Sequence, residues 1–289
     1  MRIVFYTSGI TGAGRLVLGI SIGNALARHG IECKYTIVHT SPVAFLANDL
    51  NNIKIPLENE TELSPKNFHK SILYKTLAKL KPDILIVNHT WFMIYNIIEE
   101  MKCQKLYLSD YVYDSHFKVP IAEGVLSFKP EQYERLIAIE PFKSPIPMEN
   151  INPLVMRNRD EILSRDKAID RLGLDNGRKI ALYAYSGNPE DQSDFMDKYQ
   201  DLENNYQVVK SSVFDKGLFP IVDYYNAFDF IICTGGYNFV WDSVYFMKKA
   251  VFEPVPVIFC DQKKRIENSR DFSFDVNGAD QLIKNILAL

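Results

Sequence analysis

The stretch Asp229–Asp242, DFIICTGGYNFVWD, contains an apolar run, two glycines and the start of an amphipathic segment. The apolar run predicts a buried β-strand, and the segment after the glycines predicts an α-helix. Glycines at such a turn let the backbone approach a ligand, and a helix N-terminus offers N–H groups to phosphate. Asn238 is expected to cap this helix, and Asp242 lies one turn further on the same face, where a carboxylate can accept hydrogen bonds from two ribose hydroxyls. The pattern also fits a plain strand–helix turn with an exposed aspartate.

Short apolar runs alternate with longer periodic segments along the rest of the chain. Strands are predicted at Ile3–Tyr6, Glu32–Val38, Asp83–Val87, Gln104–Leu108, Leu136–Ile139, Lys179–Tyr185, Tyr206–Val209, Asp229–Cys233 and Ala250–Glu253. Helices are predicted at Leu16–Arg28, Lys66–Leu80, Trp91–Met101, Asp160–Leu172, Ile221–Ala227, Tyr237–Met247 and Asp261–Arg270, and Ala279–Leu287 closes the chain. This alternation predicts an α/β fold whose parallel sheets are covered on both faces.

The segment Glu140–Pro153 interrupts the alternation, with four of the chain's 14 prolines and little periodicity. Such a composition is typical of a linker, and a length of 289 residues allows two domains. We therefore expect two doubly wound, Rossmann-like units, residues 1–145 and residues 154–289, which face each other across a cleft. Ligands of such sheets bind at the carboxyl ends of the strands, so the chemistry is expected in that cleft.

The composition is that of an ordinary globular protein, with 47% hydrophobic and 24% charged residues. The net charge of −3 gives no electrostatic reason to expect nucleic acid as a partner. The four cysteines form no metal-binding pattern, which favours buried thiols in a reducing compartment.

No apolar run is long enough to span a membrane and the N-terminus lacks a secretory pattern, so we expect a cytoplasmic protein. Peripheral contact with a membrane stays open.

Two further glycine-containing turns follow predicted strands. The turn Tyr185-Ser186-Gly187-Asn188 has backbone N–H groups and a hydroxyl that suit an anion, although the same residues also form ordinary turns. In the first unit, the loop Gly9–Arg15 lacks the G-x-G-x-x-G spacing of dinucleotide-binding proteins. No acidic residue clearly ends the second strand, so an NAD-dependent enzyme is disfavoured.

Residues 226–256, NAFDFIICTGGYNFVWDSVYFMKKAVFEPVP, followed by Asp261–Asn268, resemble the donor-binding half of GT-B glycosyltransferases. They are most similar to the branch that contains the peptidoglycan N-acetylglucosaminyltransferase. In that branch an acidic residue, usually glutamate, lies six positions after a glycine, as Asp242 follows Gly236 here. The resemblance implies that Asp242 binds the nucleotide ribose and that Asp261 and Gln262 bind hydroxyls of the donor sugar. It also implies that residues near Leu218 and Phe219 contact the base. Together the pattern and the resemblance predict a donor site of Ser186, Gly187, Asn188, Leu218, Phe219, Gly235, Gly236, Asn238, Asp242, Asp261 and Gln262.

The candidate catalytic residues, Arg15, His89 and Asp110, lie in the first unit. The resembling family has a histidine in its glycine-rich loop where this chain has Arg15, and arginine cannot act as a base at neutral pH. Arg15 could instead neutralise a diphosphate or an acidic acceptor. His89 and Asp110 follow predicted strands and are candidates for a substitute base, with His116 as a third. For each of these residues, a structural role is the alternative.

The resemblance implies a GT-B enzyme that transfers a hexosyl or N-acetylhexosaminyl group from a nucleotide sugar, with UDP expected, to a hydroxyl of a small or lipid-linked acceptor. The first unit would bind the acceptor and the second the donor. We expect no metal and no cofactor besides this co-substrate, because no Asp-x-Asp motif lies at a suitable place. Two alternatives stay open: a nucleotide-sugar hydrolase of the same architecture, and an inactive nucleotide-sugar-binding protein. The oligomeric state is not specified by the sequence.

Overall fold

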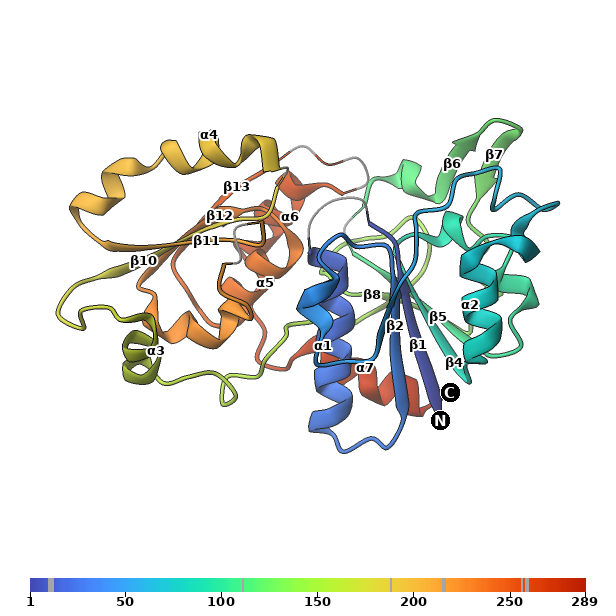
Figure 1. The fold of residues 1–289 in the computed structure, drawn as a ribbon, viewed down its shortest axis with the longest axis horizontal. Coiled ribbons are helices and arrows are strands. Elements are labelled where there is room, and N and C mark those ends of the chain that lie inside the picture. The colour runs from blue at the N-terminus through green and yellow to red at the C-terminus, as the bar shows by residue number, and fades with distance from the viewer. Residues whose placement is uncertain (10–12, 111, 188, 215–216, 256, 258–259) are drawn as a thin grey trace.

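A computed structural model describes residues 1–9, 13–110, 112–187, 189–214, 217–255, 257 and 260–289. Its first unit contains a seven-stranded sheet in the order β3-β2-β1-β4-β5-β8-β9, in which neighbouring strands are parallel (Figure 1). The strands are β1 (Arg2–Thr7), β2 (Lys34–His39), β3 (Asn52–Lys54), β4 (Ile84–Asn88), β5 (Gln104–Ser109), β8 (Arg135–Ala138) and β9 (Glu149–Asn150). Successive side chains of a strand point to opposite faces, so the central strands contribute to a hydrophobic core on each side.

Different helices cover the two faces of this first sheet (Figure 1). Helix α1 (Gly14–Arg28) packs on the face to which Ile3 and Phe5 point, and α2 (Ile72–Leu80) packs on the other face. A Cβ on Gly19 of α1 would lie 2.8 Å from the Phe5 ring. The missing side chain therefore allows α1 to lie close against the sheet.

The second unit contains a four-stranded parallel sheet in the order β11-β10-β12-β13. Its strands are β10 (Ile180–Tyr185), β11 (Gln207–Ser212), β12 (Phe230–Thr234) and β13 (Ala250–Glu253). Its helices are α3 (Arg165–Leu172), α4 (Gln192–Asp197), α5 (Tyr237–Tyr245) and α6 (Gln262–Ser269). Helix α3 ends at Gly173, whose φ of 65° is left-handed, as expected for a glycine that follows a helix. Helices α4 and α5 pack into different cores on opposite faces of the sheet.

Two predicted α-helices are instead 3-10 turns. The segment Trp91–Met101 forms two separate short turns, and Ile221–Ala227 forms a longer one. Trp91, Ile94 and Ile97 are all buried and are spaced by three residues. Of the three, only Trp91 lies within a 3-10 turn; Ile94 and Ile97 lie between the two turns, so a helix-like spacing of buried residues does not produce an α-helix here.

Two other differences concern segments near the surface. The helix predicted over Lys66–Leu80 becomes an α-helix only at Ile72, because the Ser71 side chain caps it there by accepting a hydrogen bond. An antiparallel hairpin of β6 (Lys118–Ile121) and β7 (Gly124–Ser127) was not predicted. Its residues are half-buried or exposed, so its sequence lacks the apolar run that marks the buried strands.

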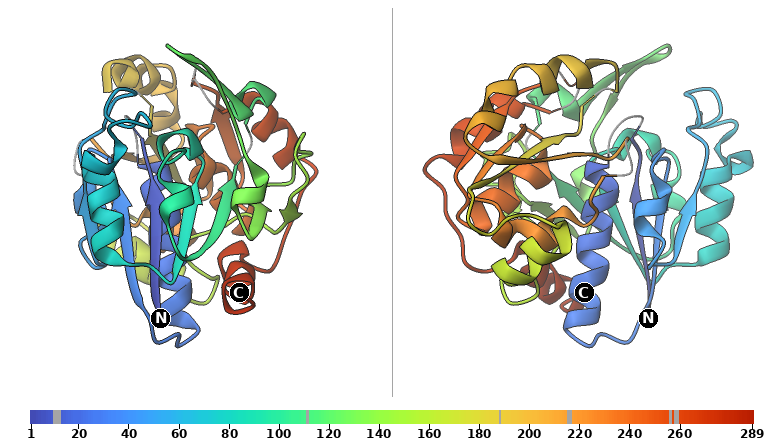
Figure 2. Two further views of the ribbon diagram at one scale, coloured as in Figure 1. Left: turned by 90° about the vertical axis from the view of Figure 1, so that its right-hand side faces the viewer. Right: turned by 60° about the vertical axis from the view of Figure 1, so that its left-hand side comes forward.

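The chain returns to the first unit at its end. Helix α7 (Gly278–Leu287) packs against α1, and both termini lie at the same end of the first unit (Figures 1 and 2). Arg28 of α1 forms an ion pair with Asp280 of α7 at 2.8 Å. The segment expected to be only a linker also supplies β9 to the edge of the first sheet. The boundaries at residues 145 and 154 stay predictions.

One hydrophobic core runs through both units on the side of α1, α5 and α7. Both sheets are parallel and have helices or 3-10 turns on their two faces. The predicted architecture of two doubly wound α/β units is therefore confirmed. Because α1 and α5 share one core, their N-terminal ends meet where the two sheets face each other.

Candidate functional site

A pocket lies between the units, where the carboxyl ends of β10 and β11 approach the N-termini of α5 and α1. It encloses about 690 Å³ of space that no atom fills, part of which is open to solvent. Its wall is mostly apolar, with a few polar groups, as in pockets that bind small molecules. The short polar side chains in the wall are Ser186, Ser211, Ser212, Asn238 and Asp242.

Among the described residues that line the pocket, Asp242 is the one acid. It is buried, with 6% of the residue exposed, and its carboxyl group forms no hydrogen bond or ion pair with any described residue. Burial therefore raises the pKa of Asp242 to about 8. The alternative of an exposed aspartate is wrong. A buried acid without a partner destabilises the protein, unless a ligand supplies the missing hydrogen bonds.

Asn238 does not cap α5, contrary to the prediction. The capping position is Gly236, and no side chain accepts a hydrogen bond there. Asn238 is the second residue of the helix, two positions past the capping position. Its Nδ2 instead donates a hydrogen bond of 3.2 Å to the carbonyl oxygen of Gly14 on α1. Asn238 thus joins the two units at the edge of the pocket.

The turn after β10 contributes one side chain to the pocket. Ser186 lines the wall, and its hydroxyl lies 2.9 Å from the Thr234 hydroxyl at the end of β12. Gly236 faces Ser186, and a Cβ there would lie 3.4 Å from the serine hydroxyl. Gly187 does not line the pocket, and Asn188 lies outside the described residues. The start of α5 therefore lies beside the Ser186 hydroxyl in the pocket wall.

Asp261 and Gln262 have structural contacts at the start of α6. The Asp261 carboxylate accepts a 3.0 Å hydrogen bond from the Lys264 N–H and caps the helix. Gln262 Oε1 accepts a 2.9 Å hydrogen bond from the Val255 N–H. Neither residue lines the pocket, and Gly235, also predicted, packs against Gln262 rather than facing the pocket. Their role in donor binding stays a prediction.

Leu218 and Phe219 line the pocket in the segment after β11. Six of the predicted donor-site residues thus line one pocket: Ser186, Leu218, Phe219, Gly236, Asn238 and Asp242.

Within the described residues, no group of three or more His, Cys, Asp and Glu side chains is placed to hold a metal ion. In that same part of the chain, no helix is both long and apolar enough to cross a membrane.

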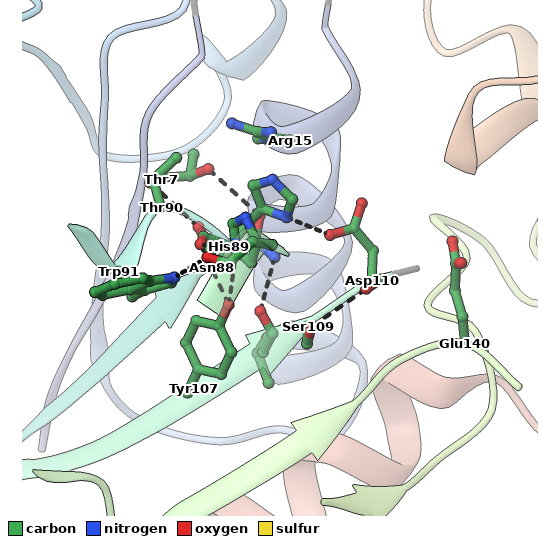
Figure 3. A network of polar contacts seen from close by, with 12 residues as sticks. Thr7, Arg15, Asn88, His89, Thr90, Trp91, Tyr107, Ser109, Asp110 and Glu140 are labelled. Atoms are coloured by element: carbon green, nitrogen blue, oxygen red, sulfur yellow. Dashed lines mark hydrogen bonds and ion pairs between the residues drawn. The ribbon is translucent and has the colours of Figure 1, made fainter. Parts of the chain in front are cut away.

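His89 and Asp110 are paired at the carboxyl ends of β4 and β5 (Figure 3). The Nδ1 atom of His89 lies 2.7 Å from Asp110 Oδ1. Because a carboxylate only accepts hydrogen bonds, Nδ1 carries the proton and Nε2 carries the lone pair. His89 has a left-handed backbone with φ of 62°, and its carbonyl oxygen accepts hydrogen bonds from the Trp91 N–H and from His116 Nε2. These bonds hold the strained residue in place.

Burial and the nearby Arg15 lower the pKa of His89. Burial alone would raise the pKa of Asp110, but His89, Arg265 and Arg15 outweigh it and hold that pKa well below its usual range. A neutral imidazole therefore meets an ionised carboxylate near pH 7. His116 packs on His89 with ring centroids 4.2 Å apart, and burial lowers the pKa of His116 to about 3. The His89 ring itself is fully buried and is not part of the pocket wall.

Arg15 lies in the first turn of α1, close to His89 (Figure 3). Its Nη1 donates a 2.6 Å hydrogen bond to the carbonyl oxygen of Ser8. Burial lowers the pKa of Arg15 while Asp110 opposes the shift, and a guanidinium stays charged at neutral pH. Residues 10–12 of the predicted glycine-rich loop lie outside the described residues, but Gly14 lines the pocket.

Sequence reasoning missed two charged residues beside this pair, Glu140 and Arg265. Arg265 Nε donates a 2.6 Å hydrogen bond to Glu140 Oε1, and Arg265 Nη2 lies 3.4 Å from Asp110 Oδ2. Glu140 Oε1 also accepts a 3.0 Å hydrogen bond from Trp241 Nε1. Arg265 belongs to a short basic run, Lys263–Arg265, which usually indicates a solvated helix face. The one signal at Glu140 is its position directly after an apolar strand.

No model of a known protein family matches the sequence, and no curated protein matches it. Solved structures of glycosyltransferases, however, match it over nearly its whole length. SsfS6 from Streptomyces sp. SF2575 is 13% identical with a TM-score of 0.54, and the match covers 100% of this chain and 96% of that one. VinC, solved in complex with DTDP, is 12% identical with a TM-score of 0.58, covering 99% and 90%. SnogD from Streptomyces nogalater is 12% identical with a TM-score of 0.58, covering 99% and 100%.

These matches identify the fold as that of the GT-B glycosyltransferases, with two Rossmann-like units. The fold class predicted from the sequence is confirmed. At 12–13% identity the similarity is one of fold, and function has to be argued from the pocket and its residues.

Proposed function

We propose that this protein binds a nucleoside-diphosphate sugar in the pocket between its units and transfers the sugar to a hydroxyl acceptor. The observation that carries the proposal is the buried Asp242 carboxyl, which lines the pocket without a partner among the described residues. Two similar structures, VinC with DTDP and SsfS6 with thymidine diphosphate, contain a nucleotide of this class. The fold supports the proposal as well.

The donor would lie along the wall of the second unit. Asp242 would accept hydrogen bonds from the ribose hydroxyls, and the base would pack near Leu218 and Phe219. The diphosphate would approach the Ser186 hydroxyl and the N–H groups at the start of α5, next to Gly236. The residue pattern around Asp242 supports UDP as the nucleotide and the N-acetylglucosaminyltransferase branch as the relatives. We propose no cofactor or metal in addition.

In the transfer step, an acceptor oxygen forms a bond to the anomeric carbon while the bond from that carbon to the diphosphate breaks. The diphosphate leaves with the bonding electrons, and the acceptor hydroxyl loses its proton. We infer that His89 Nε2 takes this proton and that Asp110 stabilises the resulting imidazolium. The positive charge of Arg15 would favour the departing diphosphate.

A panel of UDP-, dTDP- and GDP-linked sugars tests the proposal, with free nucleoside diphosphate measured with and without acceptors. Release only with an acceptor supports transfer, and release without an acceptor indicates a hydrolase. Calorimetry with UDP and dTDP measures binding alone. A protein that binds no nucleotide in this series would contradict the proposal.

The second candidate is a nucleotide-sugar-binding protein without transferase activity. The full burial of the His89 ring favours it, because a general base has to contact the acceptor hydroxyl. Nucleotide binding without release of diphosphate under any condition would identify this case.

A further inference from the structure

A chain of buried polar contacts crosses from one unit to the other. It runs from His89 to Asp110 at 2.7 Å, and from Asp110 to Arg265 at 3.4 Å. It continues from Arg265 to Glu140 at 2.6 Å, and from Glu140 to Trp241 at 3.0 Å. Trp241 directly precedes the pocket acid on α5. The chain therefore connects the proposed base to the helix that lines the donor pocket.

The charged members of this chain are almost completely buried. Arg265 is 2% exposed and Glu140 is 1% exposed. Charges stay in such surroundings only when they are paired and hydrogen-bonded, since water no longer stabilises them. One guanidinium serves two carboxylates, Glu140 through Nε and Asp110 through Nη2. The contacts with Glu140 and Asp110 together therefore fix the position of the guanidinium.

The contacts of Asp110 divide between the two units. Oδ1 bonds to His89 in the same unit, and Oδ2 faces Arg265 of α6 in the other unit. The guanidinium also donates a 3.3 Å hydrogen bond to the carbonyl oxygen of Gly235, in the turn that leads into α5. Arg265 thus contacts both the carboxylate that orients His89 and the turn that begins the helix of the donor pocket.

We propose that Arg265 is a positioning residue, which orients the Asp110 carboxylate from the donor-binding unit and through it sets the His89 imidazole. The residue does not contact substrate; it acts through Asp110. The effect of Arg265 on catalysis rests on the proposed function, in which His89 is the base. The contact geometry, however, can be tested without any turnover.

The charge around His89 predicts a direction for the test. Asp110 faces the imidazole from the end of β5 and His116 from the neighbouring 3-10 turn, while the Tyr107 hydroxyl of β5 donates to the His89 carbonyl oxygen. Two cations act on the ring from helices, Arg15 from α1 and Arg265 from α6. Both arginines disfavour the protonated imidazole. Removal of the Arg265 charge should therefore raise the pKa of His89. Removal of the more distant Glu140 charge should not raise it.

The test compares the double variant E140Q/R265Q with its matched control E140Q, both in the full chain. The double variant replaces a buried cation and a buried anion by a pair of amides, so Asp110 loses its contact with Arg265 while no net charge is added. The control keeps Arg265 beside Asp110. Nitrogen NMR of histidine, assigned with His89→Gln, reports the pKa and tautomer of His89 in each protein.

We expect a higher pKa of His89 in E140Q/R265Q than in the wild type, and no rise in E140Q. With an active donor and acceptor, kcat should fall about tenfold in the double variant, within the usual range of coupling between sites, and its acid limb should move to higher pH. UDP affinity should stay within about twofold of the wild type, a change that is small on the scale of binding free energies. If the double variant does not fold, R265K should show a smaller shift in the same direction.

An unchanged His89 resonance and tautomer in E140Q/R265Q would overturn the inference, and so would an equal pKa shift in E140Q. Failure of the proposed function has a different signature, because the wild type would then bind no nucleotide or release no diphosphate. The NMR comparison still reports the pKa and tautomer of His89 in that case, so the two failures are distinguishable.

Discussion

Asn238 and Asp242 lie one turn apart on α5 and line the same pocket, but only Asn238 is satisfied by the protein. Its Nδ2 donates to the Gly14 carbonyl oxygen at 3.2 Å. The side-chain amide of Asn238 thus links α5 to the first unit, whereas the Asp242 carboxyl has no partner among the described residues.

Above pH 8, where the Asp242 carboxyl is ionised, replacement of Asp242 by asparagine should weaken nucleotide binding by roughly 1–3 kcal/mol, the scale of hydrogen bonds to a charged group. The reason is that an amide accepts fewer hydrogen bonds from ribose hydroxyls than a carboxylate does. Calorimetric titration with UDP measures the change, with Asp242→Glu as the conservative control. An unchanged affinity in folded Asp242→Asn would remove Asp242 from the donor site.

The same substitution should change how stability depends on pH. The pKa of Asp242 is about 8 in the folded protein and roughly 4 when unfolded. The folded state therefore binds the proton more tightly, and stability falls as pH rises from about 4 to about 8. We expect this group to cost the wild type on the order of a few kcal/mol at the upper end of the window. Urea unfolding should show Asp242→Asn equal to the wild type near pH 3 but more stable above pH 8; parallel curves would contradict the assignment.

His89→Gln should lower kcat by roughly 10²- to 10⁴-fold, the usual contribution of a general base. Nucleotide affinity should not change, because His89 does not line the pocket. Initial rates and calorimetry on the same preparation separate the two effects. The exposed His69 supplies a control, and His69→Gln should behave as the wild type. Equal rates in both variants would exclude His89 as the base.

Gly236→Ala should weaken nucleotide binding without affecting the fold. The φ of −64° at Gly236 is one that alanine adopts, and the added Cβ would lie 3.4 Å from the Ser186 hydroxyl. The methyl group would occupy space at the start of α5, where the diphosphate is proposed to bind. We expect about a tenfold loss of UDP affinity, or ~1.4 kcal/mol, with little change in melting temperature. Full affinity in this variant would place the diphosphate elsewhere.

Gly278→Ala should destabilise the protein by about 1–3 kcal/mol, the usual cost of overpacking. A Cβ on Gly278, the first residue of α7, would overlap the carbonyl oxygen of Asn152 in the connecting segment. Gly14→Ala is the matched control, since its Cβ would lie 3.7 Å from Asn238 Nδ2, an ordinary contact. Urea unfolding measures both variants, and equal stabilities would show that α7 shifts to accommodate the methyl group.

Local patterns predicted most of the regular structure. The run Lys179–Tyr185, for example, is β10 from Ile180 onwards, because a strand buried on both faces needs apolar side chains at every position. The patterns failed at two segments. The hairpin of β6 and β7 is partly exposed and lacks an apolar run, and Trp91–Met101 has buried residues at a helix-like spacing but forms two short 3-10 turns.

At the candidate site, the order of a strand, two glycines and a helix was enough to predict Asp242 as a donor-site residue, since these features are neighbours in the chain. The interaction between Asp110 and Arg265 has no such local basis, because 155 positions separate the two residues. The alternation of apolar runs predicted two parallel sheets and the sheet edge at which we propose that the ligand binds. The packing of one sheet against the other decided which buried charges meet across that edge, because such contacts depend on the placement of both units and leave no periodic pattern in the sequence.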